Sequence, residues 1–224
     1  FLLSKLAAEV AKKAAAKFST AEWPRFVIGS MGPTTKTISV TGGITFDQLR
    51  VDYQEQAAGL LAGGADLILL ETSQDTLNVK AGLIAIFDAL KASGRTVPVM
   101  LYVTIEPMGT MLAGQTIDAL YASVMHFDLL SVGMNCATGP DFMTDHIRSL
   151  SEISRFAISC MPNAGLPDVD GKYNETPEIL AKKVERFVDN GWVNILGGCC
   201  GTTPEHISAM RTMLDQKKKP RELS

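Results

Sequence analysis

Three of the four cysteines stand at positions where thiols could do chemistry. Each follows an apolar stretch and has glycines nearby: Cys136 comes after residues 129–132, and Cys199 and Cys200 come after residues 192–196. Thiolates favour a soft metal such as zinc over magnesium or calcium. Three of them leave one position of a tetrahedral zinc ion open, as in catalytic sites. We therefore predict that these thiols meet at one site and hold a metal ion.

The charge of such a centre limits its chemistry. Zinc with three thiolates has a net negative charge and is a weak Lewis acid toward carbonyl groups. It can still bind an incoming thiol, lower the pKa of that thiol and keep it as a nucleophilic thiolate. This favours alkyl transfer to sulfur over hydrolysis.

The cysteine count also bears on the compartment. Four cysteines are too few for a disulfide scaffold in a chain of 224 residues, and a bridge between the neighbours Cys199 and Cys200 would be strained. We therefore expect reduced thiols and a cytoplasmic protein. Cys160 lies inside an apolar run, where a free cysteine is expected to act as a small buried hydrophobic residue.

Two further polar residues follow apolar runs and have more than one interpretation each. Glu71 either caps the next helix or is a plain surface carboxylate, or it presents its carboxylate to a substrate ammonium group. Asn163 either shapes a turn or hydrogen-bonds substrate and reaches the metal. The three histidines lie on predicted helices without paired spacing, so we expect surface or helix-end residues rather than metal ligands.

The elements that must position these groups are short apolar strands. They are nearly all apolar instead of alternating, which is typical of parallel strands buried on both faces. The predicted strands are residues 26–30, 66–71, 97–103, 129–132, 156–161 and 193–196.

Helices are predicted before and between these strands. Thr45 followed by Gln48 has the spacing of a capping box, and prolines at 177 and 204 suit the first turn of a helix. The predicted helices are residues 1–18, 45–62, 75–92, 116–125, 141–154, 176–190 and 203–216.

A strand and helix that alternate about every 30 residues predict an α/β fold with a parallel sheet. Both an open doubly wound sheet and a (β/α)8 TIM-type barrel fit this pattern. Polar groups follow nearly every strand, which favours the barrel, because its active site lies at the carboxyl ends of the strands. Six units are two fewer than a barrel has, so we expect strands 3–8 here and the first two strands before residue 1.

The composition excludes several kinds of partner. The chain is 46% hydrophobic with a formal net charge of -3 and no central basic cluster, which argues against nucleic acid. No apolar run reaches the roughly 18 residues that a membrane span needs.

We predict one module over residues 1–216, and a basic tail or the start of an interdomain linker over residues 217–224.

The cysteine motifs resemble those of a known family. Residues 133–136 (GMNC) and 197–201 (GGCCG) are similar to the two zinc-ligand signatures of the homocysteine S-methyltransferases. Within that family, residues 29–35, 71–75 and 162–167 resemble the cobalamin-dependent methionine synthases. The resemblance covers residues 1–213.

The resemblance implies a β/α barrel in which Cys136, Cys199 and Cys200 ligate zinc. It implies that Glu71 contacts the amino group of homocysteine, and that Asn163 lies near the metal as a fourth ligand when substrate is absent. In the family, the homocysteine sulfur replaces that ligand and attacks the methyl group of methylcobalamin, which gives methionine.

We also predict that Asn135 and Ser30 take part in substrate binding, since both lie at strand ends within the matching motifs. The family's first strand, with its Asp-Gly-Ala-Met-Gly-Thr type of motif, is not in this sequence, and neither is a cobalamin-binding Asp-x-His-x-x-Gly signature. We therefore expect cobalamin-binding and folate-binding domains elsewhere in a longer parent chain.

Two alternatives stay open from the sequence. The first keeps homocysteine as the acceptor but uses betaine or S-methylmethionine as the methyl donor. The second is a non-catalytic barrel that stores zinc or senses redox state through its clustered thiols.

Overall fold

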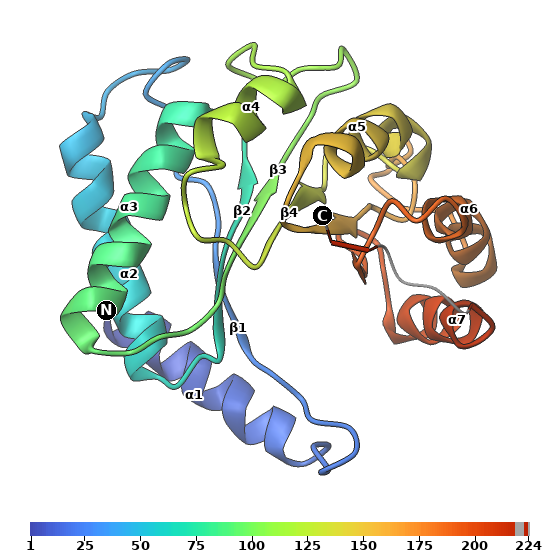
Figure 1. The fold of residues 1–224 in the computed structure, drawn as a ribbon, viewed down its shortest axis with the longest axis horizontal. Helices are drawn as coiled ribbons and strands as arrows, with labels where there is room; N and C mark the ends of the chain where they lie inside the picture. The colour runs from blue at the N-terminus through green and yellow to red at the C-terminus, as the bar shows by residue number, and fades with distance from the viewer. Residues whose placement is uncertain (218–221, 224) are drawn as a thin grey trace. The chain divides into compact units, whose positions relative to one another are not determined.

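The computed structural model describes residues 1–217 and 222–223, and over these residues helices alternate with parallel strands (Figure 1). The six strands follow one another in the sheet in chain order, from β1 to β6. The chain forms two compact units, residues 1–101 with 127–129 and residues 102–126 with 130–224. Each unit is described by itself below.

The first unit contains the beginning of the predicted strand–helix pattern. Figure 1 shows α2 and α3 side by side next to the strands. Strands β1 and β2 pair in parallel, with Ile28 opposite Leu67. The elements are α1 (Leu2–Ala16), β1 (Ile28–Met31), α2 (Phe46–Ala62), β2 (Leu67–Ser73) and α3 (Thr76–Ser93). Strand β3 (Val99–Val103) begins in this unit and ends in the second.

Side-chain caps fix the starts of α2 and α3 in the first unit. The predicted capping box is confirmed: the Thr45 side chain accepts from the Gln48 amide, and the Gln48 side chain accepts from the Thr45 amide. Asp75 caps α3 by accepting from the Leu77 amide, and it also accepts from the amide and hydroxyl of Ser39. The fully buried Asp75 carboxylate thus ties the loop after β1 to the start of α3.

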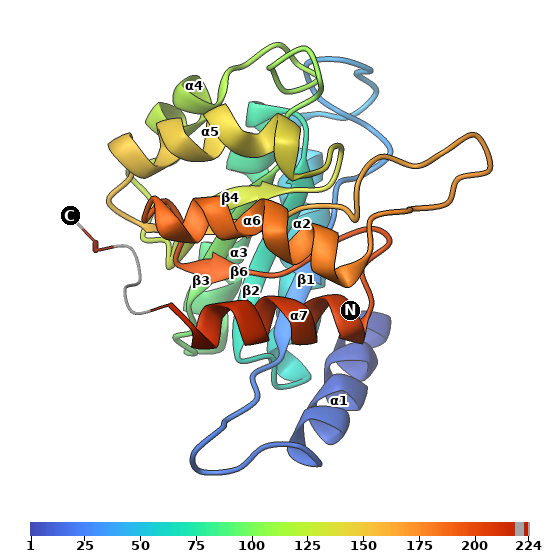
Figure 2. The same ribbon diagram turned by 90° about the vertical axis from the view of Figure 1, so that its right-hand side faces the viewer.

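The second unit continues the same pattern, and Figure 2 shows α5, α6 and α7 running beside one another. Strands β4 and β5 pair in parallel from Ser131–Ala157 to Asn135–Met161, and β5 pairs with β6. The elements are α4 (Ile117–Val124), β4 (Ser131–Asn135), α5 (Pro140–Ile153), β5 (Ala157–Met161), α6 (Pro177–Asp189), β6 (Ile195–Leu196) and α7 (Pro204–Asp215).

Strands β3 and β4 and most of β2 and β5 are buried as the apolar runs predicted, but β1 alternates exposed and buried residues and β6 is only half-buried. The observed bounds also differ from the predicted ones, most of all for the fourth strand. Every residue of β3 and β4 is buried. We predicted the fourth strand over residues 129–132, whereas β4 runs from Ser131 to Asn135. The strand continues through Gly133 because glycine, without a side chain, fits against the backbone of Ser159. Asn135 is therefore the last residue of the strand and not the first residue after it.

In the predicted tail, residues 218–221 and 224 lie outside the described residues, and Lys217 forms ion pairs with Glu185 (2.8 Å) and Asp189 (2.6 Å) of the second unit. Among the described helices, none is both long and apolar enough to cross a membrane.

Candidate metal centre

The three predicted thiols come together in the second unit. Cys136 directly follows β4, and Cys199 and Cys200 follow β6. The sulfur of Cys200 lies 3.7 Å from that of Cys136 and 3.9 Å from that of Cys199, and all three sulfurs lie within 4.8 Å of one another. Sulfurs bound at about 2.3 Å to one tetrahedral zinc ion would be about 3.8 Å apart. The spacing therefore fits ligands of a single zinc ion.

The backbone at Cys136 has an unusual conformation. Cys136 and Ala137 have φ values of 58° and 52°, a left-handed region that residues with a Cβ seldom adopt. The Cys136 amide donates to the carbonyl of Met161 on β5 at 3.3 Å, and the Thr138 amide donates to the Cys136 carbonyl at 2.6 Å. Strained backbone held by surrounding bonds is typical of functional sites, and here it orients the thiol.

The turn that carries the other two cysteines is bound to the loop after β5. The Cys199 amide donates to the Pro162 carbonyl at 2.9 Å, and the Ala164 amide donates to the Cys200 carbonyl at 2.9 Å. Asn163 is buried, and its side-chain oxygen accepts from the Cys200 amide at 3.1 Å. Asn163 thus lies beside Cys200 and holds the turn through a side-chain bond.

Asn135 also lies at the thiols. Its side chain is buried, and its amide nitrogen lies 3.9 Å from the sulfur of Cys199. An N–H group directed at a thiolate stabilises the negative charge. Asn135 can therefore stabilise Cys199 as a thiolate that binds a metal ion. Cys160, in contrast, is fully buried next to Met143 and lies outside the cluster, as predicted.

Burial and the neighbouring thiols act on two of the clustered cysteines. Burial, with smaller contributions from Cys136 and Cys200, raises the pKa of Cys199 to about 12. Burial likewise raises the pKa of Cys136. Such thiols become thiolates beside a strong positive charge, and a divalent cation deprotonates a coordinating thiol. The site therefore fits a metal ion better than it fits free thiolates.

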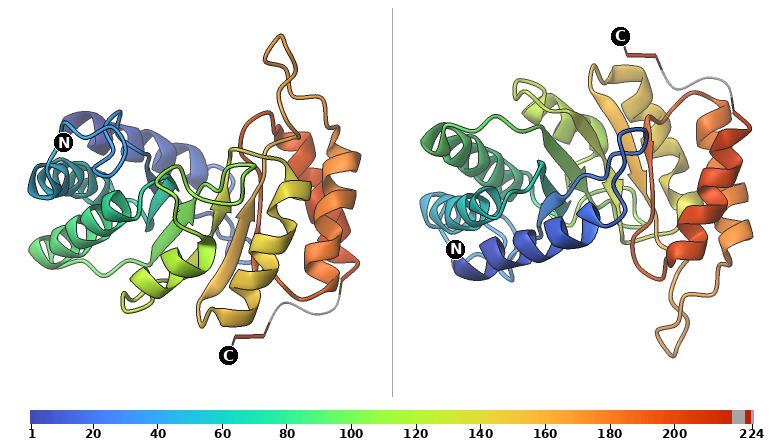
Figure 3. Two further views of the ribbon diagram at one scale, coloured as in Figure 1. Left: turned by 90° about the horizontal axis from the view of Figure 1, so that it is seen from above. Right: turned by 90° about the horizontal axis from the view of Figure 1, so that it is seen from below.

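Sequence reasoning missed two residues that adjoin this turn. Tyr173 packs against Gly201, where an added Cβ would lie 2.3 Å from the Cβ of Tyr173. Its pKa is raised, first by burial and then by Cys200. Tyr173 comes from the segment between β5 and α6, which projects from the second unit in Figures 2 and 3. The second is His206, which is a helix-end residue as predicted, on the first turn of α7, but is buried there and does not lie on the surface.

Glu71 and Ser30 belong to the first unit. Ser30 lies on β1 and Glu71 on the neighbouring strand β2, and the Ser30 hydroxyl donates to the Glu71 carboxylate. The interpretation of Glu71 as a helix cap is wrong, because Asp75 caps α3. The carboxylate is thus oriented by a partner on the adjacent strand.

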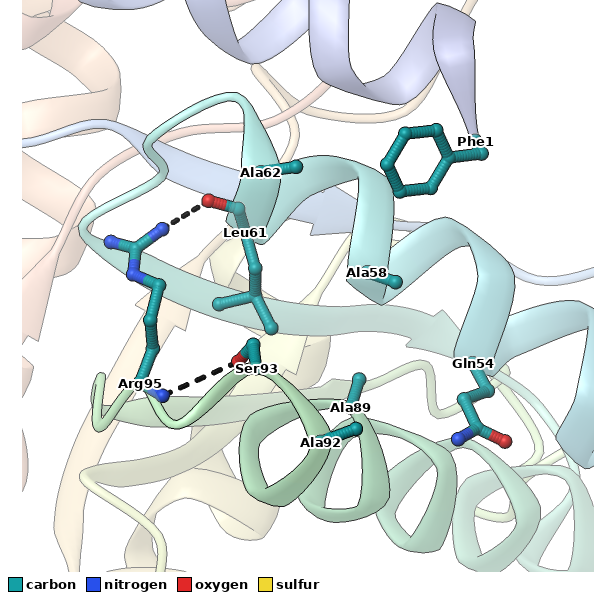
Figure 4. Close-up of a pocket in the computed structure, with 9 residues that line it drawn as sticks. All are labelled: Phe1, Gln54, Ala58, Leu61, Ala62, Ala89, Ala92, Ser93 and Arg95. Atoms are coloured by element: carbon teal, nitrogen blue, oxygen red, sulfur yellow. Dashed lines mark hydrogen bonds between the residues drawn. The ribbon is translucent and has the colours of Figure 1, made fainter.

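A pocket in the first unit contains none of the predicted site residues. Figure 4 shows it between α2 and α3, with Arg95 donating to the carbonyl of Leu61. Its lining is mostly small and apolar, and consists of Phe1, Gln54, Ala58, Leu61, Ala62, Ala89, Ala92, Ser93 and Arg95. With no thiol or carboxylate side chain among these residues, the pocket is not a candidate for the chemistry predicted from the cysteines.

Parallel β/α units with three thiols gathered beyond two strand ends define a barrel-type protein with a candidate thiolate metal site. The chain belongs to the homocysteine S-methyltransferase family, whose sequence model matches residues 2–214.

Two mycobacterial relatives are longer than this chain. It is 42% identical over 208 residues to the methionine synthase of Mycobacterium leprae, with 92% of this chain and 17% of that protein covered. It is 40% identical over 221 residues to the methionine synthase of Mycobacterium tuberculosis, with 97% of this chain and 18% of that protein covered. The chain thus spans under a fifth of the length of these relatives.

Solved structures confirm the fold class. The apo form of the homocysteine methyltransferase MmuM from Escherichia coli has a TM-score of 0.74 at 21% identity, with 94% of this chain and 72% of that chain covered. The metallated form of the same enzyme has a TM-score of 0.75 at 20% identity, with coverage of 94% and 69%. A match to roughly 70% of a larger barrel-type chain fits the prediction that six of eight β/α units are present.

Proposed function

We propose that this chain is the homocysteine-binding module of a methionine synthase and that Cys136, Cys199 and Cys200 hold a catalytic zinc ion. The observation that carries the proposal is the cluster of three sulfurs within 4.8 Å of one another. Membership of the homocysteine S-methyltransferase family and the names of the two longer relatives support it.

The residues of the chain have separate tasks in this mechanism. When bound, zinc would supply the positive charge that keeps a substrate thiol deprotonated at neutral pH. Asn135 directs an N–H group at the Cys199 sulfur, which stabilises the anionic ligand set. Asn163 holds Cys200 in place through its amide. The three cysteines leave room for one more sulfur, which we assign to homocysteine.

The reaction is a transfer of a methyl group to sulfur. A lone pair of the homocysteine thiolate forms the new S–CH3 bond while the bond between the methyl group and its donor breaks, and the donor keeps that electron pair. We propose methylcobalamin as the donor, carried by another domain of a longer parent chain that also holds a folate-binding domain. Residues 1–216 would then form the homocysteine module, and residues 217–224 would begin a linker.

Replacing Glu71 with glutamine should weaken homocysteine binding by about 10-fold, because a charge-assisted bond to the substrate ammonium is replaced by a neutral one. Zinc content should stay unchanged, since Glu71 is not part of the thiol cluster. Calorimetric titration of the zinc-loaded protein with homocysteine measures the effect. Homocysteine affinity equal to that of the wild type would remove Glu71 from the proposed pocket.

The identity of the methyl donor can be tested with the full-length wild-type protein. Methylcobalamin should lose its visible spectrum when homocysteine is added, and methionine should form in equal amount. Turnover with betaine or S-methylmethionine and none with methylcobalamin would replace the donor but keep the reaction class. Zinc release on mild oxidation without any homocysteine binding would instead favour a zinc-storing or redox-sensing barrel.

A further inference from the structure

We propose that His206 is a positioning residue that fixes the cysteine turn of the metal centre. This inference rests on the proposed function, because it assumes that the three thiols bind zinc. His206 is only 6% exposed, lies six residues after Cys200 in the chain, and is not one of the clustered groups. It therefore acts on the metal centre through its hydrogen bonds and not as a ligand.

Two backbone partners of the imidazole determine its tautomer, and the Thr203 hydroxyl also lies 3.1 Å from Nδ1. The backbone amide of Thr203 lies 3.1 Å from Nδ1, and an N–H group can only donate. The backbone carbonyl of Glu175 lies 2.9 Å from Nε2, and a carbonyl can only accept. The partners thus assign the N–H group of the imidazole to Nε2 and the acceptor to Nδ1, and each nitrogen has one backbone partner of fixed polarity.

These bonds close a ring around the cysteine turn. His206 Nε2 donates to the Glu175 carbonyl, the Glu175 amide donates to the Ala164 carbonyl at 3.2 Å, and the Ala164 amide donates to the Cys200 carbonyl at 2.9 Å. From Cys200 the chain continues to Thr203, whose amide donates back to His206. Loss of the bond to Glu175 would open this ring, whereas without the Thr203 bond the ring stays closed through the chain between Thr203 and His206.

An ion pair holds Glu175 itself in place. Its side chain forms an ion pair with Lys183 on α6, and Lys183 also pairs with Asp141 on α5 at 2.7 Å. The bond from His206 therefore connects the turn of Cys199 and Cys200 to two helices of the second unit. A turn that is already ordered loses less conformational entropy when its thiols take up a metal ion.

The competing explanation is that His206 only caps α7. Its Nδ1 bond to Thr203 is half of a capping box, as Gln48 forms with Thr45 in α2. That role needs one nitrogen only and ends within the helix. The bond from Nε2 to Glu175, 31 residues earlier in the chain, contributes nothing to a cap. Variants that keep the bond to Thr203 and lose the bond to Glu175, or the reverse, therefore decide between the two explanations.

Two variants separate them in the full-length protein. His206→Asn keeps an oxygen near the position of Nδ1 for the Thr203 amide but is too short to reach Glu175. His206→Gln can place an amide N–H near the position of Nε2 and restore the bond to the Glu175 carbonyl. Thr116→Ala is the matched control, since it removes the N-cap of α4 in the same unit, which is not part of the ring.

Zinc affinity is measured by competition with a chromogenic chelator, and the thermal unfolding of the zinc-free proteins is measured in parallel. We expect His206→Asn to bind zinc about 10- to 100-fold more weakly, the usual effect of losing a group that orients a metal ligand. His206→Gln should recover most of that affinity. Thr116→Ala should bind zinc like the wild type although its unfolding temperature falls.

Wild-type zinc affinity in His206→Asn, or equal losses in His206→Asn and Thr116→Ala, would overturn the inference and leave the proposed function intact. A wild-type protein that binds no zinc would overturn both. Zinc affinity that falls as expected, in a protein whose wild type does not methylate homocysteine, would overturn the proposed function alone.

Discussion

Cys200→Ser should lose zinc and methyl transfer together. Cys200 is the middle thiol of the cluster, 3.7 Å from the sulfur of Cys136 and 3.9 Å from that of Cys199. A serine hydroxyl stays protonated at neutral pH and is a poor zinc ligand. Thiolate-rich zinc sites bind with roughly 10–16 kcal/mol, so one ligand of four contributes about 3 kcal/mol. That loss lowers zinc affinity by more than about 100-fold.

The zinc content of the purified protein, measured by atomic emission, and the rate of methionine formation report this effect. Cys160→Ala is the matched control, because it removes a thiol that is fully buried in β5 and lies outside the cluster. It should keep zinc and activity and lose only about 1 kcal/mol of stability to the small cavity. A Cys200→Ser protein that retains stoichiometric zinc would show that the cluster is not the metal site.

The thiol cluster could be predicted from the sequence because the repeat of strand and helix carries the geometry. Parallel strands that each return through a helix place their carboxyl ends at one edge of the sheet. Cys136 and Cys199 therefore meet although 63 positions separate them in the sequence. The capping box of Thr45 and Gln48 was equally accessible, since its partners lie within one helical turn.

The hydrogen bonds that hold the cysteine turn and orient Glu71 could not be predicted from the sequence. Their partners are distant in the chain and are of common residue types. Asn163 and Cys200 are 37 residues apart, and His206 and Glu175 are 31 apart. The bond between Ser30 and Glu71 depends on the register of two strands, which an apolar run does not determine. The end of β4 was missed because Gly133 and Asn135, which are poor strand formers by propensity, are held there by pairing with β5.

That pairing leads to the second large effect, which we expect from Gly133→Ala. A Cβ added at Gly133 would lie 1.9 Å from the Ser159 carbonyl oxygen and 2.7 Å from its carbon. Both are backbone atoms of the paired strand β5, so no side-chain rotation relieves the clash. Alanine is favoured over glycine in a strand by about 0.5–1 kcal/mol, whereas forced overpacking costs about 3 kcal/mol or more. The clash therefore dominates, with a net loss of roughly 2–3 kcal/mol.

For a chain of this size, such a loss lowers the unfolding temperature by about 5–10 °C, which calorimetry of the zinc-free protein measures. Zinc affinity should fall as well, because β4 carries Asn135 and leads directly into Cys136. Gly32→Ala is the matched control: a Cβ there meets nothing within 4 Å, and the residue does not have a positive φ. If Gly133→Ala unfolds at the wild-type temperature, β4 and β5 do not pair in the register that brings Gly133 against Ser159, and the placement of Cys136 by that register is wrong.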